Sequence, residues 1–361
     1  MRSNLFRSAA LLVCLPIVSE LPATPESPHN PVVPAAEEES LPGRYLRIMN
    51  QSRLTYDLGF GKVDSPVEYL SCGSISTSLR VVPSESGKSL QPWTPAKKAA
   101  PHFDAAEKHF SARRLQEAAG EYAKGLALDP EYGPGWLYSG DVPFGLGDYE
   151  AALASYRKAL ALDPTLPQAH RFAGDALLKL GRLTEAEAEY VQALINDHSY
   201  RGAWQGLEIL GDRMGFKVDR PEFSPPENVI GRRQGDKVRI GLDENSEWTG
   251  YFLCKAVWRH EDEYRRQRLG EKDGKEYSWT LAEERECLAS YLETNLTYAA
   301  GKPEKMPPTA RHLAEVTEAG LIDGYIVVAV IGQRCPMVVS MMPQDFLDQA
   351  EQYVRRFVTV R

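Results

Sequence analysis

Side chains that could perform catalysis are few in this sequence. The run His-Glu-Asp-Glu at 260–263 places an imidazole beside carboxylates, but it lacks the second histidine of the zinc-binding H-E-x-x-H motif and is typical of a solvated helix face. Glu283, Glu284 and Glu286 could act as paired carboxylates, yet acidic residues are expected in the first turn of any helix, because the helix dipole favours negative charge there. The sequence contains no G-x-S-x-G, Walker or C-x-x-C motif. We therefore predict no catalytic residue, no metal ligand and no cofactor.

The cysteines offer a second kind of chemistry. The chain has five, and four remain if an N-terminal signal that includes Cys14 is removed. An even number of cysteines in an exported protein is compatible with disulfides. Cys254, Cys287 and Cys335 all lie in the C-terminal part of the chain, and a bond between Cys254 and Cys287 would join two expected helices. The alternative is buried free thiols, which pack as small hydrophobic groups.

A repeated pattern of small and aromatic residues occupies the middle of the chain. Segments 136–164 and 170–198 align without a gap at a period of 34 residues, and a further shift extends the pattern towards the N-terminus. Repeats of this period predict a solenoid of paired helices, in which each unit packs against its neighbours. The matching pairs are Gly140 with Gly174, Gly147 with Gly181, Ala152 with Ala186, Tyr156 with Tyr190, and Ala159 with Ala193.

The repeated residues have the sizes that packed helical hairpins need. Small residues at Gly140 and Ala152 allow the two helices of one hairpin to approach closely, whereas Tyr156 fills the gap between successive hairpins. Gly147 falls at the turn between helices, where a left-handed backbone favours glycine. Pro164 follows the second helix and prevents its continuation. Each unit is therefore predicted to be a helical hairpin.

This pattern resembles the tetratricopeptide repeat over residues 101–211. Two features depart from the family. Pro143 stands inside the first helix of the second unit, where the family usually has a large residue, and it predicts a kinked or shortened helix. His198 stands where a proline usually ends the third unit. The helix expected over 200–210 resembles the terminal helix that caps such arrays, so the predicted array covers 101–213.

The resemblance implies that the array binds a partner. In this family the first helices of the units line a concave groove, which holds an extended peptide or the surface of a partner protein. The N-terminal half of the groove would be apolar and the C-terminal half charged with mixed sign. The alternative is that Phe103 and Phe110 pack under the preceding linker. The groove-facing positions of the family correspond here to Phe103, Glu107, Phe110, Leu137, Asp141, Phe144, Arg171, Asp175 and Lys179.

The charges in the expected groove argue against one version of the family. That version clamps a C-terminal carboxylate with several lysine, arginine and asparagine side chains. In this sequence Arg171 and Lys179 are offset by Asp141 and Asp175. The resemblance therefore implies a protein or peptide partner without implying a carboxylate clamp.

The N-terminal residues have the pattern of an export signal. Two arginines precede an apolar stretch at 9–18, so residues 1–23 are predicted to be a signal peptide and the protein to be exported, whether periplasmic, envelope-associated or secreted. A short N-terminal helix of a cytosolic protein is the alternative. Cys14 could instead carry a lipid anchor as in bacterial lipoproteins, but Val13 is larger than the residue that usually precedes such a cysteine.

Segments of different character flank the array. Residues 24–100 are rich in proline and serine and are predicted to form a linker, in which 44–82 is compatible with short strands or with a loosely ordered chain. In residues 226–361, helical apolar spacing alternates with two β-branched runs, 324–331 and 337–342, which are predicted to be strands. The predicted fold class is mainly α: a helical-hairpin solenoid followed by an α+β C-terminal domain whose family the sequence does not reveal.

The overall composition limits the function. The 361 residues carry a net charge of −8 and no strongly basic segment, so nucleic acid is not an expected partner. No apolar run approaches the ~18 residues of a transmembrane helix. We expect a non-enzymatic scaffold of the cell envelope or secreted space that binds a peptide or protein through the groove. The alternative is a hydrolase or transferase whose C-terminal domain uses His260 or His312 with carboxylates, and a third interpretation is a structural assembly factor of the envelope.

Overall fold

The structure of the chain is a computed structural model. It divides into two compact units, in each of which most contacts are made within the unit. The first unit combines the residues before 72 with 222–322, and the second combines 72–221 with 323–361. The predicted signal and the predicted lipid site at Cys14 lie outside the described residues. The structure describes residues 39–60, 79–84, 87–226, 230, 233–242, 247–270 and 277–361.

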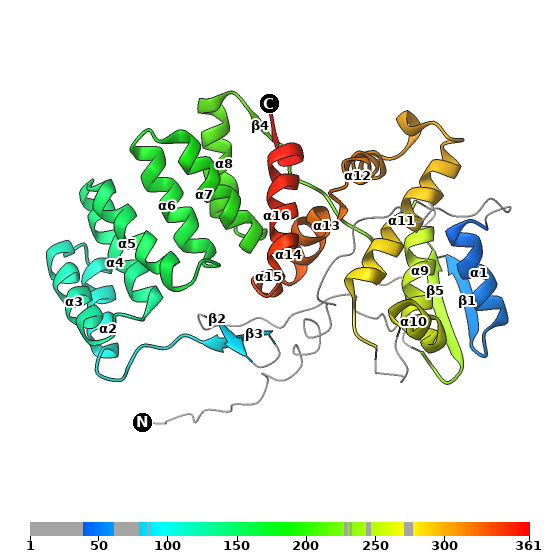
Figure 1. Cartoon of the computed structure of the whole chain (residues 1–361), viewed down its shortest axis with the longest axis horizontal. Coiled ribbons are helices and arrows are strands. Elements are labelled where there is room, and N and C mark those ends of the chain that lie inside the picture. The colour runs from blue at the N-terminus through cyan, green and yellow to red at the C-terminus, as the bar shows by residue number, and fades with distance from the viewer. Residues whose placement is uncertain are drawn as a thin grey trace. The chain divides into compact units, whose positions relative to one another are not determined.

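The second unit contains the predicted helical-hairpin solenoid, which is confirmed (Figure 1). Three hairpins follow one another along the chain, and a single helix follows the third. The hairpin pairs are α2 (Ala100–Ser111) with α3 (Leu115–Leu128), α4 (Gly133–Leu146) with α5 (Tyr149–Leu162), and α6 (Pro167–Lys179) with α7 (Leu183–Asn196), and the single helix is α8 (Arg201–Met214).

Close contacts between glycines and tyrosines explain why the repeated residues are needed. A Cβ atom on Gly140 would lie 2.5 Å from the Tyr156 ring. The Tyr190 ring would lie 2.9 Å from a Cβ on Gly174 in its own hairpin and 2.2 Å from one on Gly206 in α8. Each tyrosine ring therefore occupies space that only glycine leaves open, and Tyr190 joins its hairpin to the next helix.

Pro143 lies inside α4 without ending it. The sequence predicts a kinked or shortened helix at this proline, but α4 has 14 residues, the same number as α5. The expected shortening is therefore wrong. The helix ends at Gly147 instead, where φ is +84° and the left-handed conformation favours glycine.

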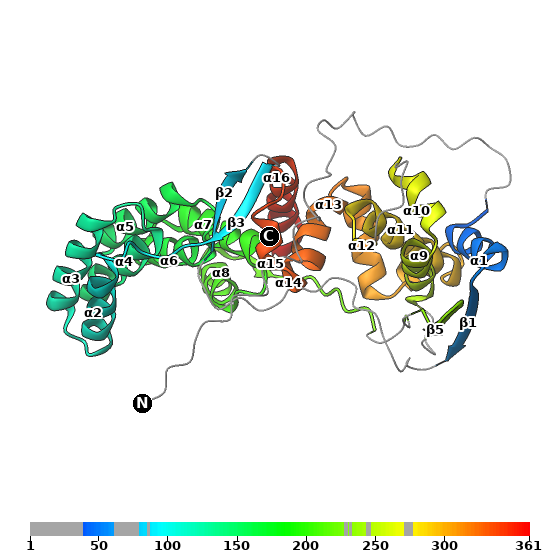
Figure 2. The same cartoon turned by 90° about the horizontal axis from the view of Figure 1, so that it is seen from below.

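Part of the predicted linker is ordered against the array. Strands β2 (Leu79–Ser84) and β3 (Gly87–Pro92) form an antiparallel hairpin (Figure 2). This hairpin and the residues that follow it are hydrogen-bonded to the loops that join successive helical hairpins. The backbone N–H of Val81 donates to Asp163 Oδ2 at 3.4 Å, and the N–H of Ala96 donates to Asp129 Oδ2 at 2.7 Å. Trp93 Nε1 also donates to a backbone carbonyl in the loop after α3.

Residues 323–361 complete the second unit by packing on α7. Arg361 Nη2 lies 2.6 Å from Glu187 Oε2, and Gln192 Nε2 donates to Glu351 Oε2 at 2.9 Å. β6 (Thr359–Val360) pairs antiparallel with β4 (Lys217–Val218), which directly follows α8. The other elements here are α13 (Ile322–Tyr325), the π-helical segments Ile326–Ile331 and Val354–Val358, α14 (Gly332–Arg334), α15 (Pro336–Val339) and α16 (Gln344–Tyr353).

Two expectations for the C-terminal region need correction. The β-branched run 324–331 is helical, and 337–342 holds the end of α15 and a turn, so neither forms the predicted strand. Val327 through Ile331 are at most 2% exposed, and a short apolar run that is buried on every side has the same pattern in a helix as in a strand. Residues 226–361 are also divided between the two units, which differs from the single domain predicted for them.

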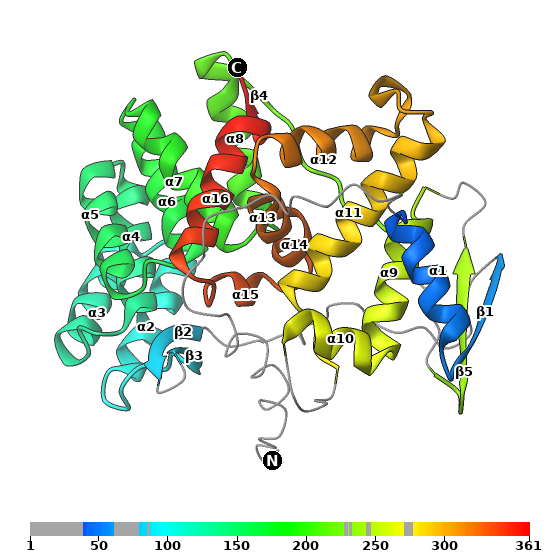
Figure 3. The same cartoon turned by 45° about the vertical axis from the view of Figure 1, so that its right-hand side comes forward.

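The first unit is a helical bundle with one parallel strand pair (Figure 3). Strand β1 (Thr55–Phe60) pairs with β5 (Lys237–Leu242) in the register Thr55 to Lys237. A disulfide between Cys254 and Cys287, with Cα atoms 5.2 Å apart, joins α9 to α11. The helices are α1 (Leu41–Gln51), α9 (Thr249–His260), α10 (Asp262–Leu269), α11 (Leu281–Tyr298) and α12 (Pro308–Glu318), with a 3-10 turn at Pro303–Lys305.

Within the described ranges, no helix is both long enough and apolar enough to span a bilayer.

Candidate functional site

The first helix of each hairpin carries a carboxylate at the same repeat position. These carboxylates lie on α2, α4 and α6 and recur every 34 residues. Each accepts a hydrogen bond from a tyrosine 15 residues later, in the second helix of the same hairpin. Because the tyrosines are fixed by packing, the three carboxylates are held in matching orientations. The pairs are Glu107 with Tyr122, Asp141 with Tyr156 at 2.8 Å, and Asp175 with Tyr190 at 2.7 Å.

The three carboxylates also interact electrostatically. Burial raises the pKa of Asp141 to about 6, and the negative charges of Glu107 and Asp175 add to this rise, while the Tyr156 hydrogen bond opposes it. Burial likewise raises the pKa of Asp175, although Tyr190 and Arg171 oppose the rise. The carboxylate row therefore acts as one negatively charged strip, whose central member is subject to the charges of both neighbours.

An aromatic side chain lies among the acidic residues. Tyr138 on α4 is 39% exposed, and burial raises the pKa of its hydroxyl, with further increases from the charges of Glu107 and Asp141. Sequence reasoning missed Tyr138, because the resemblance assigns the groove to the neighbouring position, Leu137. Its spacing could have revealed it: Tyr138 stands three residues before Asp141, so the two side chains lie on the same side of α4.

The first phenylalanine expected in the groove packs inside the hairpins. Phe103 is 7% exposed, and its ring centroid lies 4.9 Å from that of Tyr132. A Cβ atom on Gly135 would lie 2.6 Å from the Phe103 ring, so this glycine leaves the space that the ring fills. Phe103 therefore belongs to the core and not to an open groove.

The other apolar positions of the expected groove are also covered to a large extent. Phe110 is partly buried and packs against the same core as Phe103. The centroid of the Phe144 ring lies 5.3 Å from that of Tyr149. Leu137 is 3% exposed. The expected apolar half of the groove is thus largely absent, because these side chains pack within the array.

Basic side chains lie towards the C-terminal end of the carboxylate row. Arg171 Nη2 lies 2.9 Å from Asp175 Oδ2, one helical turn away on α6. Lys179 is exposed at the end of that helix. Asp175 is therefore partly neutralised, whereas no ion pair within the described residues involves Glu107 or Asp141. The strip is most negative over α2 and α4.

The residues considered for catalysis at 260–263 have structural roles instead. Glu261 accepts hydrogen bonds from Ser52 Oγ and Tyr56 Oη, both at 2.6 Å. Burial lowers the pKa of His260 to about 4, and its Nε2 is buried without a hydrogen bond. Among the described residues, His260 is therefore not paired with the carboxylate beside it in sequence.

The acidic first turn of α11 is buried. Glu283 and Glu284 are at most 1% exposed, and both lie within 3.0 Å of Lys255 Nζ. Glu286 is 6% exposed and pairs with Arg268 at 2.6 Å. A substrate could not reach these carboxylates without opening the unit. In the part of the chain that the structure describes, no group of three histidine, cysteine or acidic residues could hold a metal ion.

Comparison with known proteins identifies the repeats. Residues 139–203 match the family model described as "Tetratricopeptide repeat", and the chain therefore contains repeats of this kind. No curated protein matches the chain.

Several solved repeat domains are similar to the array. The second TPR domain of the human RPAP3 protein, in complex with an HSP70 peptide, is 22% identical, with 31% of this chain and 94% of that one covered and a TM-score of 0.31. The Sgt2 TPR domain from Aspergillus fumigatus is 14% identical, with 40% and 95% covered and a TM-score of 0.33. The Yersinia enterocolitica type III secretion chaperone SycD, in complex with a peptide of the translocator YopD, is 19% identical, with 33% and 96% covered and a TM-score of 0.31.

Proposed function

Because the chain carries a tetratricopeptide repeat array, we propose that it is a protein-interaction scaffold that binds a positively charged peptide segment of a partner. The segment would lie across α2, α4 and α6. The observation that carries this proposal is the row of three carboxylates, each held by a tyrosine of its own hairpin. The row supplies oriented acceptors at a repeated spacing along one surface.

The charge of the strip favours lysine and arginine in the partner. Neither Glu107 nor Asp141 forms an ion pair among the described residues, so a partner cation would form new charge-assisted hydrogen bonds. The tyrosines already fix both carboxylates, and binding therefore orders few additional side chains. Tyr138 offers a partly exposed ring on which a cation can also rest. An acidic segment would meet like charges at the same place.

The disulfide supports the proposal that the protein is exported. Cys254 and Cys287 are bonded, and Cys335 is also disulfide-bonded. Disulfides persist in oxidising compartments such as the periplasm and the extracellular space. Fractionation of cells that produce the full chain tests this: export predicts recovery outside the cytoplasm, whereas a reduced protein in the cytoplasmic fraction contradicts it.

Calorimetry with two synthetic peptides tests the proposed partner chemistry. One peptide alternates lysine with alanine, and the other alternates glutamate with alanine. The lysine peptide should bind the full chain and lose affinity as salt rises, because the contacts are ionic. The double variant Glu107→Gln with Asp141→Asn should weaken that binding by about tenfold or more.

Glu117→Gln is the matched control. Glu117 is an exposed acidic residue on α3, outside the carboxylate row, and its replacement removes a carboxylate of the same kind. An equal loss of affinity in this control, or equal binding of the glutamate peptide, would show that the strip does not select the partner.

A further inference from the structure

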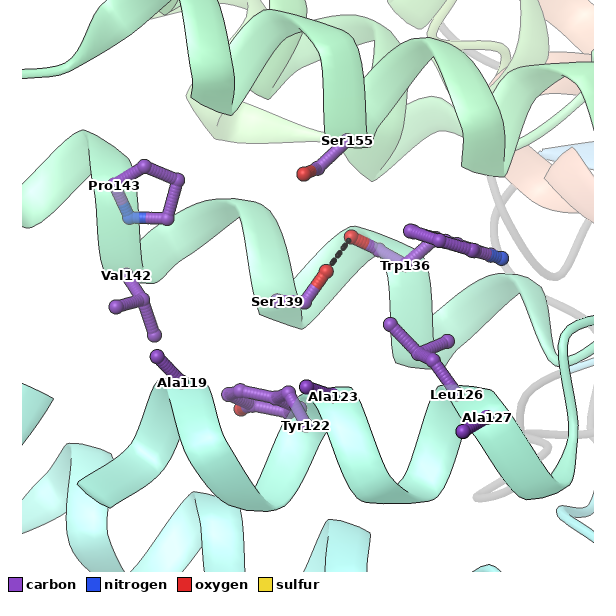
Figure 4. A pocket seen from close by; sticks show the side chains of 10 residues that line it. All are labelled: Ala119, Tyr122, Ala123, Leu126, Ala127, Trp136, Ser139, Val142, Pro143 and Ser155. Carbon is purple, nitrogen blue, oxygen red and sulfur yellow. Dashed lines mark hydrogen bonds between the residues drawn. The ribbon is translucent and has the colours of Figure 1, made fainter. Parts of the chain in front are cut away.

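A hollow of about 450 Å³ lies between α3, α4 and α5 (Figure 4). Trp136, Ser139 and Pro143 line it from one side of α4. Asp141 lies on the opposite side of that helix, since residues two or five positions away point in nearly opposite directions. The hollow therefore lies on another side of α4 from Asp141, although Tyr122, which donates to Glu107, also lines it.

The hollow exists because two residues are smaller here than in the next repeat. Ala119 on α3 and Pro143 on α4 line it. The residues 34 positions later are Leu153 and Leu177, which are 1% and 0% exposed. In the next repeat, two leucine side chains are thus buried at the positions that alanine and proline occupy here. The two missing leucine side chains account for part of this space and for its apolar character.

The lining is apolar apart from groups at its edge. Both serine hydroxyls in the lining are already used: Ser139 Oγ donates to the Trp136 carbonyl at 2.8 Å, and Ser155 Oγ donates to a carbonyl of its own helix at 3.3 Å. Lys158 Nζ lies 4.0 Å from the centroid of the Trp136 ring, and no carboxylate pairs with this lysine among the described residues. A positive charge thus stands beside an apolar hollow.

The openness of the hollow favours a protein side chain over a small molecule. Ala119, Ala123 and Ala127 lie on one face of α3 and are exposed. A bound small molecule usually buries most of its surface, which such an open wall does not allow. A helix of a partner protein that lay along these alanines would shield from solvent the side chain that it inserts into the hollow.

The repeat position of Ala119 is already used for protein packing elsewhere in this chain. Glu187 on α7 stands 68 residues after Ala119, two repeat lengths along. Residues 323–361 cover it, with Arg361 Nη2 at 2.6 Å and Arg355 Nη1 at 3.9 Å from its carboxylate. At α7, chain from outside the hairpins therefore packs at this repeat position, and the helix α16 contacts α7 beside it through Glu351.

We propose that the hollow binds a leucine-sized side chain from a helical segment of a partner protein, with an acidic residue of that segment beside Lys158. This is a second binding surface on the array, and its occupant has the opposite charge to that proposed for the carboxylate row.

A helical peptide of about 14 residues tests the proposal with the full chain. It is alanine-based and carries two leucines four positions apart with glutamates beside them. Binding is followed by the NMR signal of the Trp136 indole. The peptide should shift this signal, and a version with alanine in place of leucine should bind about tenfold more weakly. A version with lysine in place of glutamate should bind about threefold more weakly, because an exposed ion pair contributes little.

A filled-pocket variant provides the decisive comparison. Ala119→Leu with Pro143→Leu introduces the residues of the next repeat, so the fold should be retained and peptide binding should fall about tenfold or more. Ala161→Leu is the matched control, because Ala161 is exposed on α5 outside the hollow and should leave binding unchanged.

The proposal is overturned if the filled variant binds the peptide as well as the natural protein does, or if the leucine-free peptide binds equally well. It is also overturned if the peptide does not shift the Trp136 signal. Decanoate, a small apolar acid, serves as the probe for a small-molecule site, and the proposal fails if decanoate shifts this signal and the peptide does not.

Discussion

Replacing Lys255 with methionine would remove the positive charge at the centre of a buried ionic cluster. Lys255 Nζ lies 3.0 Å from Glu283 Oε1 and 2.5 Å from Glu284 Oε2, and all three side chains are at most 2% exposed. Methionine has similar length and no charge, so the substitution leaves two carboxylates buried without their cation. We expect the first unit to lose stability for this reason.

The contacts around the cluster set the size of the loss. Breaking a buried ion pair by removing one partner costs about 3–5 kcal/mol. Tyr277 donates to Glu283, and Tyr251 and Trp279 donate to Glu284, at 2.7–3.0 Å. These hydrogen bonds survive the substitution and stabilise the carboxylates in part. We therefore expect a decrease of about 3 kcal/mol in the free energy of unfolding, near the lower end of that range.

Hydrogen exchange measured by mass spectrometry can assign the loss to the correct unit. The amides of α9 and α11 should exchange about a hundredfold faster in Lys255→Met, while those of α4 and α6 should be unaffected. Lys124→Met is the matched control: its ion pair with Glu121 is exposed, so the change should be below about 1 kcal/mol. If Lys255→Met changes exchange no more than this control does, the cluster does not stabilise the unit as argued.

The pH dependence of the same variant follows from its two unpaired carboxylates. Burial without a cation raises their folded-state pKa above the unfolded value, so the charged forms destabilise the fold. The destabilisation is present at neutral pH and should decline as pH falls through the raised pKa. The difference in unfolding free energy between the natural protein and Lys255→Met should therefore narrow on acidification.

Contacts elsewhere in the chain give three more expected outcomes. The pKa of Asp141 is about 6, so its charge is lost as pH falls from 7 to 5; binding of a lysine peptide should weaken over this range, and calorimetry with Asp141→Asn should show a smaller pH effect. Gly206→Ala places a Cβ 2.2 Å from the Tyr190 ring and should cost about 1–3 kcal/mol, measured by exchange in α7 and α8. Replacing Cys254 and Cys287 with alanine leaves the disulfide of Cys335 in place and should lower the free energy of unfolding of the unit that holds α9 and α11 by about 2–4 kcal/mol, measured by denaturant unfolding.

The repeat architecture could be predicted because its packing depends on residue size at a fixed period. Gly140, Gly174 and the tyrosines that contact them are visible as identical residues 34 positions apart. The disulfide partners could be proposed from two expected helices. In contrast, the run 324–331 could not be assigned, since β-branched residues that are buried on all sides fit a helix or a strand.

The carboxylate row shows why the site was harder to predict than the fold. Asp141 and Tyr156 recur in the next repeat as Asp175 and Tyr190, so both sets were visible. Their hydrogen bonds were not, because spacing along the chain does not show which side chains meet across a hairpin. Phe103 was misplaced for a related reason: a groove position in the family can be filled from behind when a glycine leaves room for the ring.

The backbone hydrogen bonds of Val81 and Ala96 have a mechanical consequence. A solenoid of hairpins can bend and stretch along its length, because each unit contacts only its neighbours and small rotations between units add along the stack. Asp129 and Asp163 lie in the loops that follow successive hairpins. The segment from Val81 to Ala96, which the structure describes except at 85–86, is attached to both loops. Stretching or bending the array between these loops would break one of the attachments. The curvature of the carboxylate row is thereby restrained before any partner arrives.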